Sequence, residues 1–142
     1  MQAKEYLLQI KHLDLMITAW IQQKDDMRSQ LYSLSSPKYD GVAVQGTKDP
    51  DKFSEMWARI DQKERKICRE IDKLADAKQV ITEEIGRIED TRYVEILLRR
   101  YVQMQKLEDI ANEMSYSYDR IRHLHGFALL EFERVNPHIK EL

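Results

Sequence analysis

The sequence predicts an all-α protein, and three observations favour this class. Charged residues make up 34% of the chain, which has only four glycines and three prolines, a composition typical of long, solvated helices. Two long segments repeat apolar residues at alternating steps of three and four, the spacing of a coiled-coil seam. A third segment, near the C-terminus, has the pattern of shorter helices. We therefore expect an N-terminal antiparallel coiled-coil helical hairpin in residues 1–89 and a C-terminal three-helix domain in residues 90–142.

The first long helix is predicted from Tyr6 to Leu34. Its seam residues are Tyr6, Ile10, Leu13, Ile17, Trp20, Lys24, Met27, Leu31 and Leu34. Further apolar residues lie beside this seam, more than a two-stranded coil needs, and they are Leu7, Leu8, Leu15, Met16 and Ile21. This excess indicates that a third or fourth helix packs here, beyond the two of the hairpin.

A loop and a second seam follow. Residues 35–52 contain two glycines and two prolines, which permit turns and stop helices, so they are predicted to form a loop that is either functional or a simple hairpin tip. The second run extends from Phe53 to Ile88 with polar interruptions at Glu64 and Lys78. Counted outward from the loop, Lys24 and Glu64 lie at the same depth, and we expect an ion pair there to set the register of the hairpin.

The seam fails between Ile88 and Val94, where a joint is expected. Asp90 or Thr91 can cap a new helix, although an unbroken helix with a kink remains the alternative because no proline or glycine intervenes. The next apolar stripe runs from Val94 to Val102. It predicts the first helix of the C-terminal domain.

Two further helices complete that domain. Leu107, Ile110, Ala111 and Met114 share one face of a short helix, and a break follows at residues 115–117. Ser117 is a good N-cap for a second helix that continues to Arg134 and ends before Asn136-Pro137. The buried stripe of that helix is predicted to be Ile121, Leu124, Ala128, Leu129 and Phe132.

This layout is that of a helix-turn-helix, whose second helix places its first turns in the major groove of DNA. The residues left pointing outward there are Tyr118, Asp119, Arg120, Arg122 and His123. Arginine can donate two hydrogen bonds to guanine, and Asp119 can accept one from cytosine. His123 can donate to a base or a phosphate, whereas Tyr118 suits a thymine methyl group or a phosphate. An alternative is that Asp119 and Arg120 only stabilise the first helical turn.

The same residues carry a family resemblance. Residues 108–114, Tyr116-Ser117, residues 121–125 and Ala128-Leu129 resemble the DNA-reading C-terminal region, region four, of bacterial sigma factors, and residues 94–102 resemble the helix that precedes it. With the hairpin included, nearly the whole chain resembles small phage and prophage transcriptional regulators of the ArpU-like or sigma-like type. The resemblance implies a phage or prophage setting and the same five DNA-contacting positions. Gly126 and Phe127 depart from the pattern, because these families usually carry polar helix formers there.

Charge is the weak point of a DNA-binding interpretation. Residues 90–142 contain eight Lys or Arg against nine Asp or Glu, whereas DNA-binding domains are usually basic. We expect local concentration instead, with Arg99, Arg100 and Lys106 joining the arginines of the second helix to contact phosphates. Protonated His123, His125 and His138 would add charge below about pH 6.5.

Few phosphate contacts imply weak binding by one domain, so two domains on one double-stranded DNA, or a polymerase partner, are expected. The hairpin is the predicted surface for a homodimer or higher oligomer. The alternative function is a protein-interaction module that contacts RNA polymerase or a sigma factor with little direct DNA readout. A second alternative is a structural coiled-coil module.

Other functional classes have no support in the sequence. Cys68 is the only cysteine, so no intrachain disulfide is possible, and His123 and His125 face different sides of a helix, which disfavours a shared metal. No catalytic motif or cofactor-binding loop occurs, so we expect neither an enzyme nor a cofactor. No signal peptide or apolar span is visible, which favours a cytoplasmic protein without membrane contact.

Overall fold

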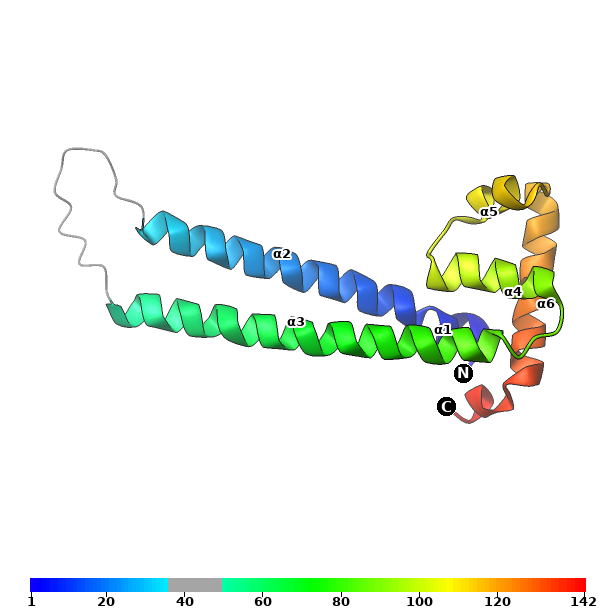
Figure 1. Ribbon diagram of the computed structural model, residues 1–142, viewed down its shortest axis with the longest axis horizontal. Helices are drawn as coiled ribbons and strands as arrows, with labels where there is room; N and C mark the ends of the chain where they lie inside the picture. The colour runs from blue at the N-terminus through cyan, green and yellow to red at the C-terminus, as the bar shows by residue number, and fades with distance from the viewer. Residues whose placement is uncertain (36–49) are drawn as a thin grey trace. The chain divides into compact units, whose positions relative to one another are not determined.

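The computed structural model describes residues 1–35 and 50–142, and within these residues every regular element is a helix (Figure 1). The predicted all-α class is therefore confirmed. In chain order the elements are α1 (Ala3–Leu7), α2 (Gln9–Ser35), α3 (Pro50–Ile85), α4 (Thr91–Leu97), the π-helix η1 (Leu98–Val102), α5 (Leu107–Met114), α6 (Tyr118–Val135) and the 3₁₀ helix η2 (Pro137–Glu141).

The predicted loop of residues 35–52 is too wide at both ends. Ser35 still belongs to α2, and Pro50 is the first residue of α3, a position where its fixed φ suits a helix and its missing N–H costs nothing. The remaining loop residues, 36–49, lie outside the described part of the chain. None of the described helices combines the length and apolar composition needed to cross a bilayer.

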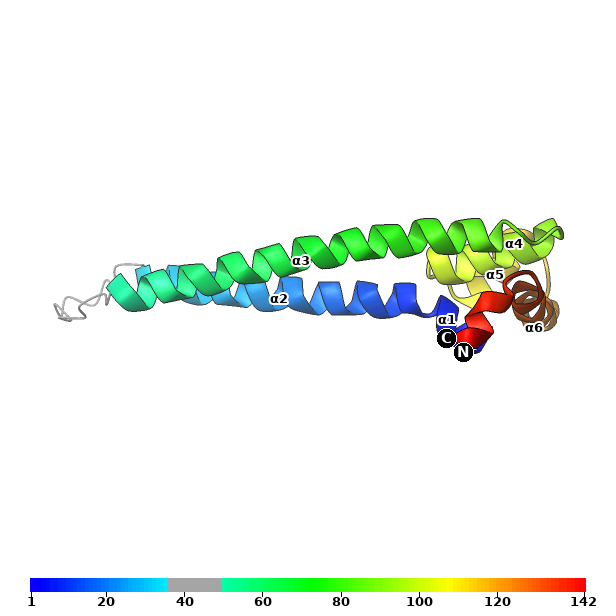
Figure 2. The ribbon, with the colours of Figure 1, turned by 90° about the horizontal axis from the view of Figure 1, so that it is seen from below.

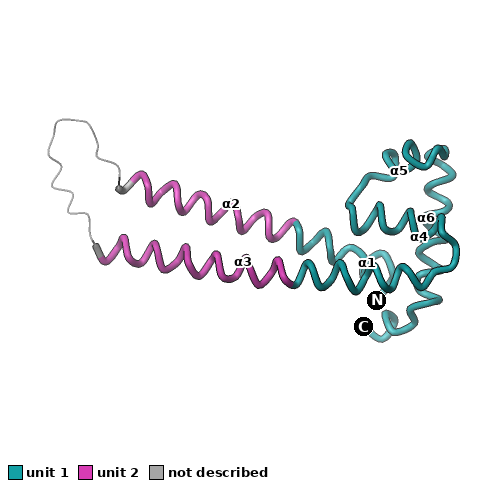
Figure 3. Tube along the Cα trace, in the orientation of Figure 1, with its two compact units in different colours: residues 1–14, 73–142 teal, residues 15–72 magenta. Residues whose placement is uncertain are grey.

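The chain divides into two compact units (Figure 3). Unit 1 comprises Met1–Asp14 and Lys73–Leu142, and unit 2 comprises Leu15–Asp72. The boundary that we expected between residues 89 and 90 lies inside unit 1, because the start of the first long helix and the end of the second share a core with the C-terminal helices.

In unit 2, parts of α2 and α3 run side by side in opposite directions (Figures 1 and 2). Ile17, Leu31, Ile60 and Ile67 are buried, as the seam pattern predicts. The ammonium group of Lys66 lies 4.3 Å from the centre of the Trp20 ring, a cation–π contact between the two helices.

The predicted ion pair between Lys24 and Glu64 is wrong. Glu64 pairs with Arg28, whereas Lys24 lies 3.9 Å from its neighbour Asp25. Arg28 is one helical turn nearer the end of α2, so the two helices are offset by about one turn from the register counted across the loop. Both side chains are more than a third exposed, and the pair stabilises the unit by about 1 kcal/mol at most.

The core of unit 1 gathers residues that are far apart in the sequence. Leu7 and Ile10 near the N-terminus, and Ile81 and Ile85 at the end of α3, pack in one buried cluster with Phe132 of α6. Leu8 separates α1 from α2, so the predicted first helix is formed in two pieces. Residues near the N-terminus and residues at the end of α3 therefore share a core with α6.

The joint before α4 is a true helix start. The Asp90 side chain accepts a hydrogen bond from the backbone N–H of Arg92 at 3.0 Å, so Asp90 is the N-cap and the alternative of an unbroken helix is excluded. α3 ends at Ile85, before the last expected seam residue. Ile88 is nevertheless buried in the connecting turn.

Candidate nucleic-acid interface

The connection between α5 and α6 fixes where α6 begins. Ser115 adopts a left-handed conformation with φ of 60°, and the N–H of Tyr116 donates back to the carbonyl oxygen of Ala111 at 2.9 Å, which closes the end of α5 as in a Schellman motif. The Ser117 hydroxyl oxygen then accepts from the N–H of Arg120 at 3.2 Å. Ser117 is thus the N-cap that the sequence predicts.

The inner face of α6 packs on α4 and α5. Ile121 and Leu124 lie in a buried cluster with Ile96 of α4 and with Ile110 and Ala111 of α5. Further along α6, Ala128 and Phe132 join the main core of unit 1, and Leu129 is half-buried. The predicted buried stripe of this helix is therefore present.

The outer face of the first two turns of α6 carries five exposed residues, and they are those predicted to contact DNA: Tyr118, Asp119, Arg120, Arg122 and His123. They form a contiguous surface because all five lie within six residues of one helix. We call this surface the α6 outer face.

Aromatic rings and one acid orient the two arginines of this face. The guanidinium carbon of Arg120 lies 5.1 Å from the centre of the Tyr116 ring, and that of Arg122 lies 5.8 Å from the Tyr118 ring. Arg122 is also 3.9 Å from the carboxylate of Asp119. These contacts limit the conformations of both side chains while leaving them exposed.

The hydrogen bond of His123 determines what its ring offers to a ligand. Its Nδ1 lies 2.7 Å from the carbonyl oxygen of Asp119. Since a carbonyl oxygen can only accept, Nδ1 carries the proton and a neutral ring presents Nε2 as an acceptor. His123 can therefore donate from Nε2 only when the ring is protonated.

The other three predicted contacts, Arg99, Arg100 and Lys106, differ in their surroundings. Arg99 is held between the carboxylates of Glu95, at 3.0 Å, and Glu113. Lys106 is exposed and precedes α5 as its N-cap residue without a capping hydrogen bond from its side chain.

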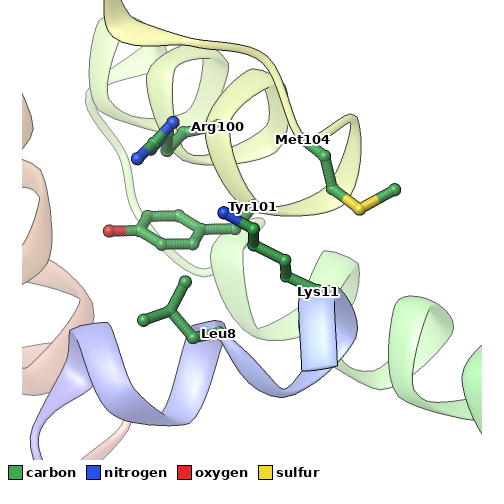
Figure 4. Close-up of a pocket in the computed structure, with 5 residues that line it drawn as sticks. All are labelled: Leu8, Lys11, Arg100, Tyr101 and Met104. Carbon is green, nitrogen blue, oxygen red and sulfur yellow. The ribbon is translucent and has the colours of Figure 1, made fainter. Parts of the chain in front are cut away.

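Arg100 is bound within the fold of unit 1. It donates to the carbonyl oxygen of Gln105 at 2.9 Å. With Tyr101, Leu8, Lys11 and Met104 it lines a small pocket at the start of α2 (Figure 4). The guanidinium group of Arg100 is therefore partly engaged within unit 1.

Buried Tyr101 of η1 pairs with half-buried His125 in the middle of α6. The Tyr101 hydroxyl is 2.8 Å from Nε2 of His125, and the two rings stack with centres 5.7 Å apart. Burial, with the positive charges of Arg100 and Lys4, lowers the pKa of His125 from 6.5 to about 4, and burial raises the pKa of Tyr101 to about 12. The expectation that His125 gains charge below about pH 6.5 is therefore wrong.

Arg92 and Tyr116 were not predicted from the sequence as part of this region. Arg92 forms an ion pair with Asp90 at 2.9 Å, and this partner raises the pKa of the guanidinium, with a smaller effect from Tyr116. Tyr116 also supports Arg120. The contact between Tyr116 and Arg120 depends on how the turn at residue 115 directs the chain, and no spacing rule in the sequence gives that direction.

The helix before α6 carries exposed acidic residues. Glu108, Asp109 and Glu113 are exposed on α5, and only Glu113 is paired with an arginine of those named above. The described residues contain no group of three or more His, Cys, Asp or Glu side chains that could hold a metal ion. The side chains of the α6 outer face supply hydrogen-bond donors, hydrogen-bond acceptors and two guanidinium groups.

Comparisons of the chain with protein-family models, with curated proteins and with solved structures find no match.

Proposed function

We propose that this protein is a sequence-specific DNA-binding transcriptional regulator of the phage or prophage type, and that it reads double-stranded DNA with the helix from Ser117 to Arg134. One observation carries the proposal. All five residues predicted to contact DNA are exposed on the first two turns of α6, while the opposite face of the same helix is buried against α4 and α5.

The arrangement of α4, α5 and α6 supports a helix-turn-helix of the sigma region-four type. In such a motif the second helix enters the major groove with its N-terminal turns, and the helix before it lies across the backbone. α5 and α6 are eight and 18 residues long and are joined by a three-residue turn. Two helices joined by a turn of this length support the assignment to such a motif.

The chemistry of the α6 outer face suits base readout. Arg120 and Arg122 each present a planar donor group that matches the O6 and N7 atoms of guanine, and Asp119 can accept from the amino group of cytosine. The aromatic contacts of both arginines reduce the entropy lost on binding. Lys106, exposed before the first turn of α5, is the proposed contact to a phosphate.

One domain offers few phosphate contacts, so we also propose that the protein acts as a homodimer or higher oligomer associated through unit 2. That unit leaves large apolar side chains of α3 exposed, among them Trp57 at 43% and Ile71 at 45%. Burying such residues between two chains would stabilise an assembly and place two reading helices on one duplex.

The acidic residues of α5 favour a second candidate function. An exposed face with Glu108 and Asp109 repels DNA phosphates but suits a basic protein surface. In this alternative the C-terminal helices contact RNA polymerase or a sigma factor and touch DNA little. The near balance of charge in residues 90–142 points the same way.

Selection from a random duplex library, followed by binding measurements on the enriched sequence at 50 and 200 mM salt, separates the two candidates. The DNA-reading proposal predicts an enriched motif that is bound at least about 100-fold more tightly than a scrambled duplex at both salt concentrations. Binding with no sequence preference at either concentration would favour the protein-interaction candidate.

A further inference from the structure

The exposed side of α6 continues past the proposed DNA-reading turns as an apolar stripe. Phe127 and Leu130 are 54% and 64% exposed, and a Cβ atom placed on Gly126 would have nothing within 4 Å. His123 and Arg134 lie on the same side, at helical spacing before and after these residues. We call the line formed by Asp119, His123, Gly126, Phe127, Leu130 and Arg134 the α6 stripe.

The α6 stripe lies opposite the buried face of the helix. At 100° per residue, its members lie within about 60° of the direction that points away from Ile121, Ala128 and Phe132. An apolar centre with charged ends on an otherwise packed helix is the pattern of a surface that a partner covers.

The spacing of the α6 stripe identifies that partner as a second copy of the same helix. When two copies run antiparallel about a two-fold axis midway between Gly126 and Phe127, Gly126 of each copy faces Phe127 of the other. In the same register His123 faces Leu130, and Asp119 faces Arg134. A large ring thus meets the residue without a side chain, and opposite charges meet at both ends.

Residues beside the α6 stripe add to this complementarity. The first turns of α6 carry Arg120 and Arg122, whereas the last turns carry Glu131 and Glu133. An antiparallel pair brings the basic half of each helix beside the acidic half of the other. A parallel pair would set Asp119 against Asp119 and Arg134 against Arg134, so charge selects the antiparallel arrangement.

The contacts that Asp119 and Arg134 make within their own helix leave both side chains able to pair with a second chain. Arg134 is held by Glu131 of its own helix, with nitrogen and oxygen 2.5 Å apart, yet 68% of its side chain is exposed. Asp119 is 83% exposed, and its partner Arg122 is 3.9 Å away. Both groups can therefore contact a second chain without losing a buried bond.

We propose that the α6 stripe is a self-association surface, on which two chains pair antiparallel about the Gly126–Phe127 midpoint. A single pair of helices of this length buries less than a standard interface, so the contact is weak and reversible. It is separate from the association proposed for unit 2.

The consequence for DNA binding rests on the proposed function. The pair covers Asp119 and His123 and places the acids of one helix beside Arg120 and Arg122 of the other. Self-association through α6 and DNA reading then compete, and the paired form is an inactive state. Duplex DNA of the preferred sequence would shift the population away from the pair.

Disulfide trapping tests the register directly and needs no DNA. In the full chain with Cys68→Ser, which removes the native thiol, two single cysteines are compared under mild oxidation: Gly126→Cys and Leu130→Cys. In the antiparallel register residue 126 is offset by about 1.5 Å along the helix from its own copy, whereas residue 130 is offset by about 10 Å, beyond the reach of a disulfide. We expect Gly126→Cys to crosslink at least tenfold faster.

Two further substitutions complete the test. Adding Leu130→Glu to the Gly126→Cys chain should slow crosslinking at least tenfold, whereas adding Leu15→Glu, at a residue of similar exposure in unit 2, should leave it unchanged. Equal rates for the two cysteines, or faster trapping of Leu130→Cys, would overturn the antiparallel pair. Because no DNA is present, these outcomes do not depend on whether the protein reads DNA.

Discussion

At the scale of single residues, the pair of buried Tyr101 and half-buried His125 supports α6 without carrying charge. Tyr101 is 3% exposed, and its hydroxyl and the imidazole satisfy each other. The pKa of His125, at about 4, is depressed from 6.5, so this histidine is neutral in the folded protein near pH 7. The pair is therefore a pH-dependent element of stability.

The first prediction concerns this pH dependence. Between about pH 6.5 and 4 the unfolded chain binds a proton at His125 that the folded chain does not, so the free energy of unfolding falls as the pH falls through this window. We expect His125 to account for a loss of about 1–2 kcal/mol, allowing for solvent screening of a partly exposed ring.

Urea unfolding of the wild type and of His125→Gln at pH 7 and pH 4.5 measures this loss. Gln can still bond to Tyr101 but does not titrate, so the stability of the variant should fall less over the same interval. An identical fall in both proteins would assign the pH dependence to other groups.

A second polar cluster holds the two chain ends together. The carboxylate of Glu84 is 3% exposed and accepts from the Tyr6 hydroxyl at 2.5 Å, while Nε2 of His138 lies 2.9 Å from its other oxygen. Burial and the bond to Glu84 raise the pKa of Tyr6 well above its usual range, so the phenol stays protonated and donates.

The second prediction follows from that bond. Tyr6→Phe removes the donor to a buried carboxylate without changing the shape of the core, and it should lower the free energy of unfolding by about 2 kcal/mol. Tyr118→Phe, at an exposed tyrosine of α6, should change it by less than about 0.5 kcal/mol. Equal effects in chemical denaturation would mean that the Tyr6 bond adds nothing.

At the scale of elements, α6 was predictable and η1 was not. The periodicity of Ile121, Leu124 and Phe132 and the cap at Ser117 specify the start and the inner face of α6. A π-helix has no comparable signal in the sequence; here the N–H of Gln103 donates to the carbonyl oxygen of Leu98, five residues earlier. Arg100 belongs to this π-helix and lines the pocket. From the sequence it was expected to contact a phosphate.

The left-handed residue between α5 and α6 provides the third prediction. Ser115 has φ of 60°, which costs a residue with a side chain about 1 kcal/mol relative to glycine. Ser115→Gly should therefore raise the free energy of unfolding by about 0.5–1 kcal/mol. Asn112→Gly, within α5, should instead lower it by about 0.5 kcal/mol.

Thermal or chemical unfolding followed by circular dichroism checks the two signs. If both glycines destabilise the protein, the turn at residue 115 is not left-handed in solution, and the placement of α6 relative to α5 would need revision.

At the scale of the whole molecule, the unforeseen feature is the core of unit 1. The heptad spacing of apolar residues predicted two long helices, and the excess of apolar residues beside the first seam indicated a further helix. Periodicity cannot name the partner of an apolar face, because any complementary surface buries it equally well. Leu7 and Ile10 therefore looked like part of a hairpin, whereas they pack in one cluster with Phe132 of α6.

The fourth prediction tests this shared core. Leu7 is fully buried, and Leu7→Ala should lower the free energy of unfolding by about 2–4 kcal/mol. Leu15→Ala, at an exposed leucine eight residues later, should cost less than about 1 kcal/mol. Similar small losses in both variants would show that the N-terminal residues do not support α6.

The central claim is that the α6 outer face reads DNA, and the most direct measurement compares two double variants on the selected duplex. Arg120→Ala with Arg122→Ala removes the two proposed base contacts. Arg59→Ala with Arg69→Ala removes the same charge from exposed positions of α3. At equal helix content and 100 mM salt, we predict at least about 100-fold weaker binding for the first variant and less than about threefold for the second. Equal affinities for the wild type and the first variant would contradict the account.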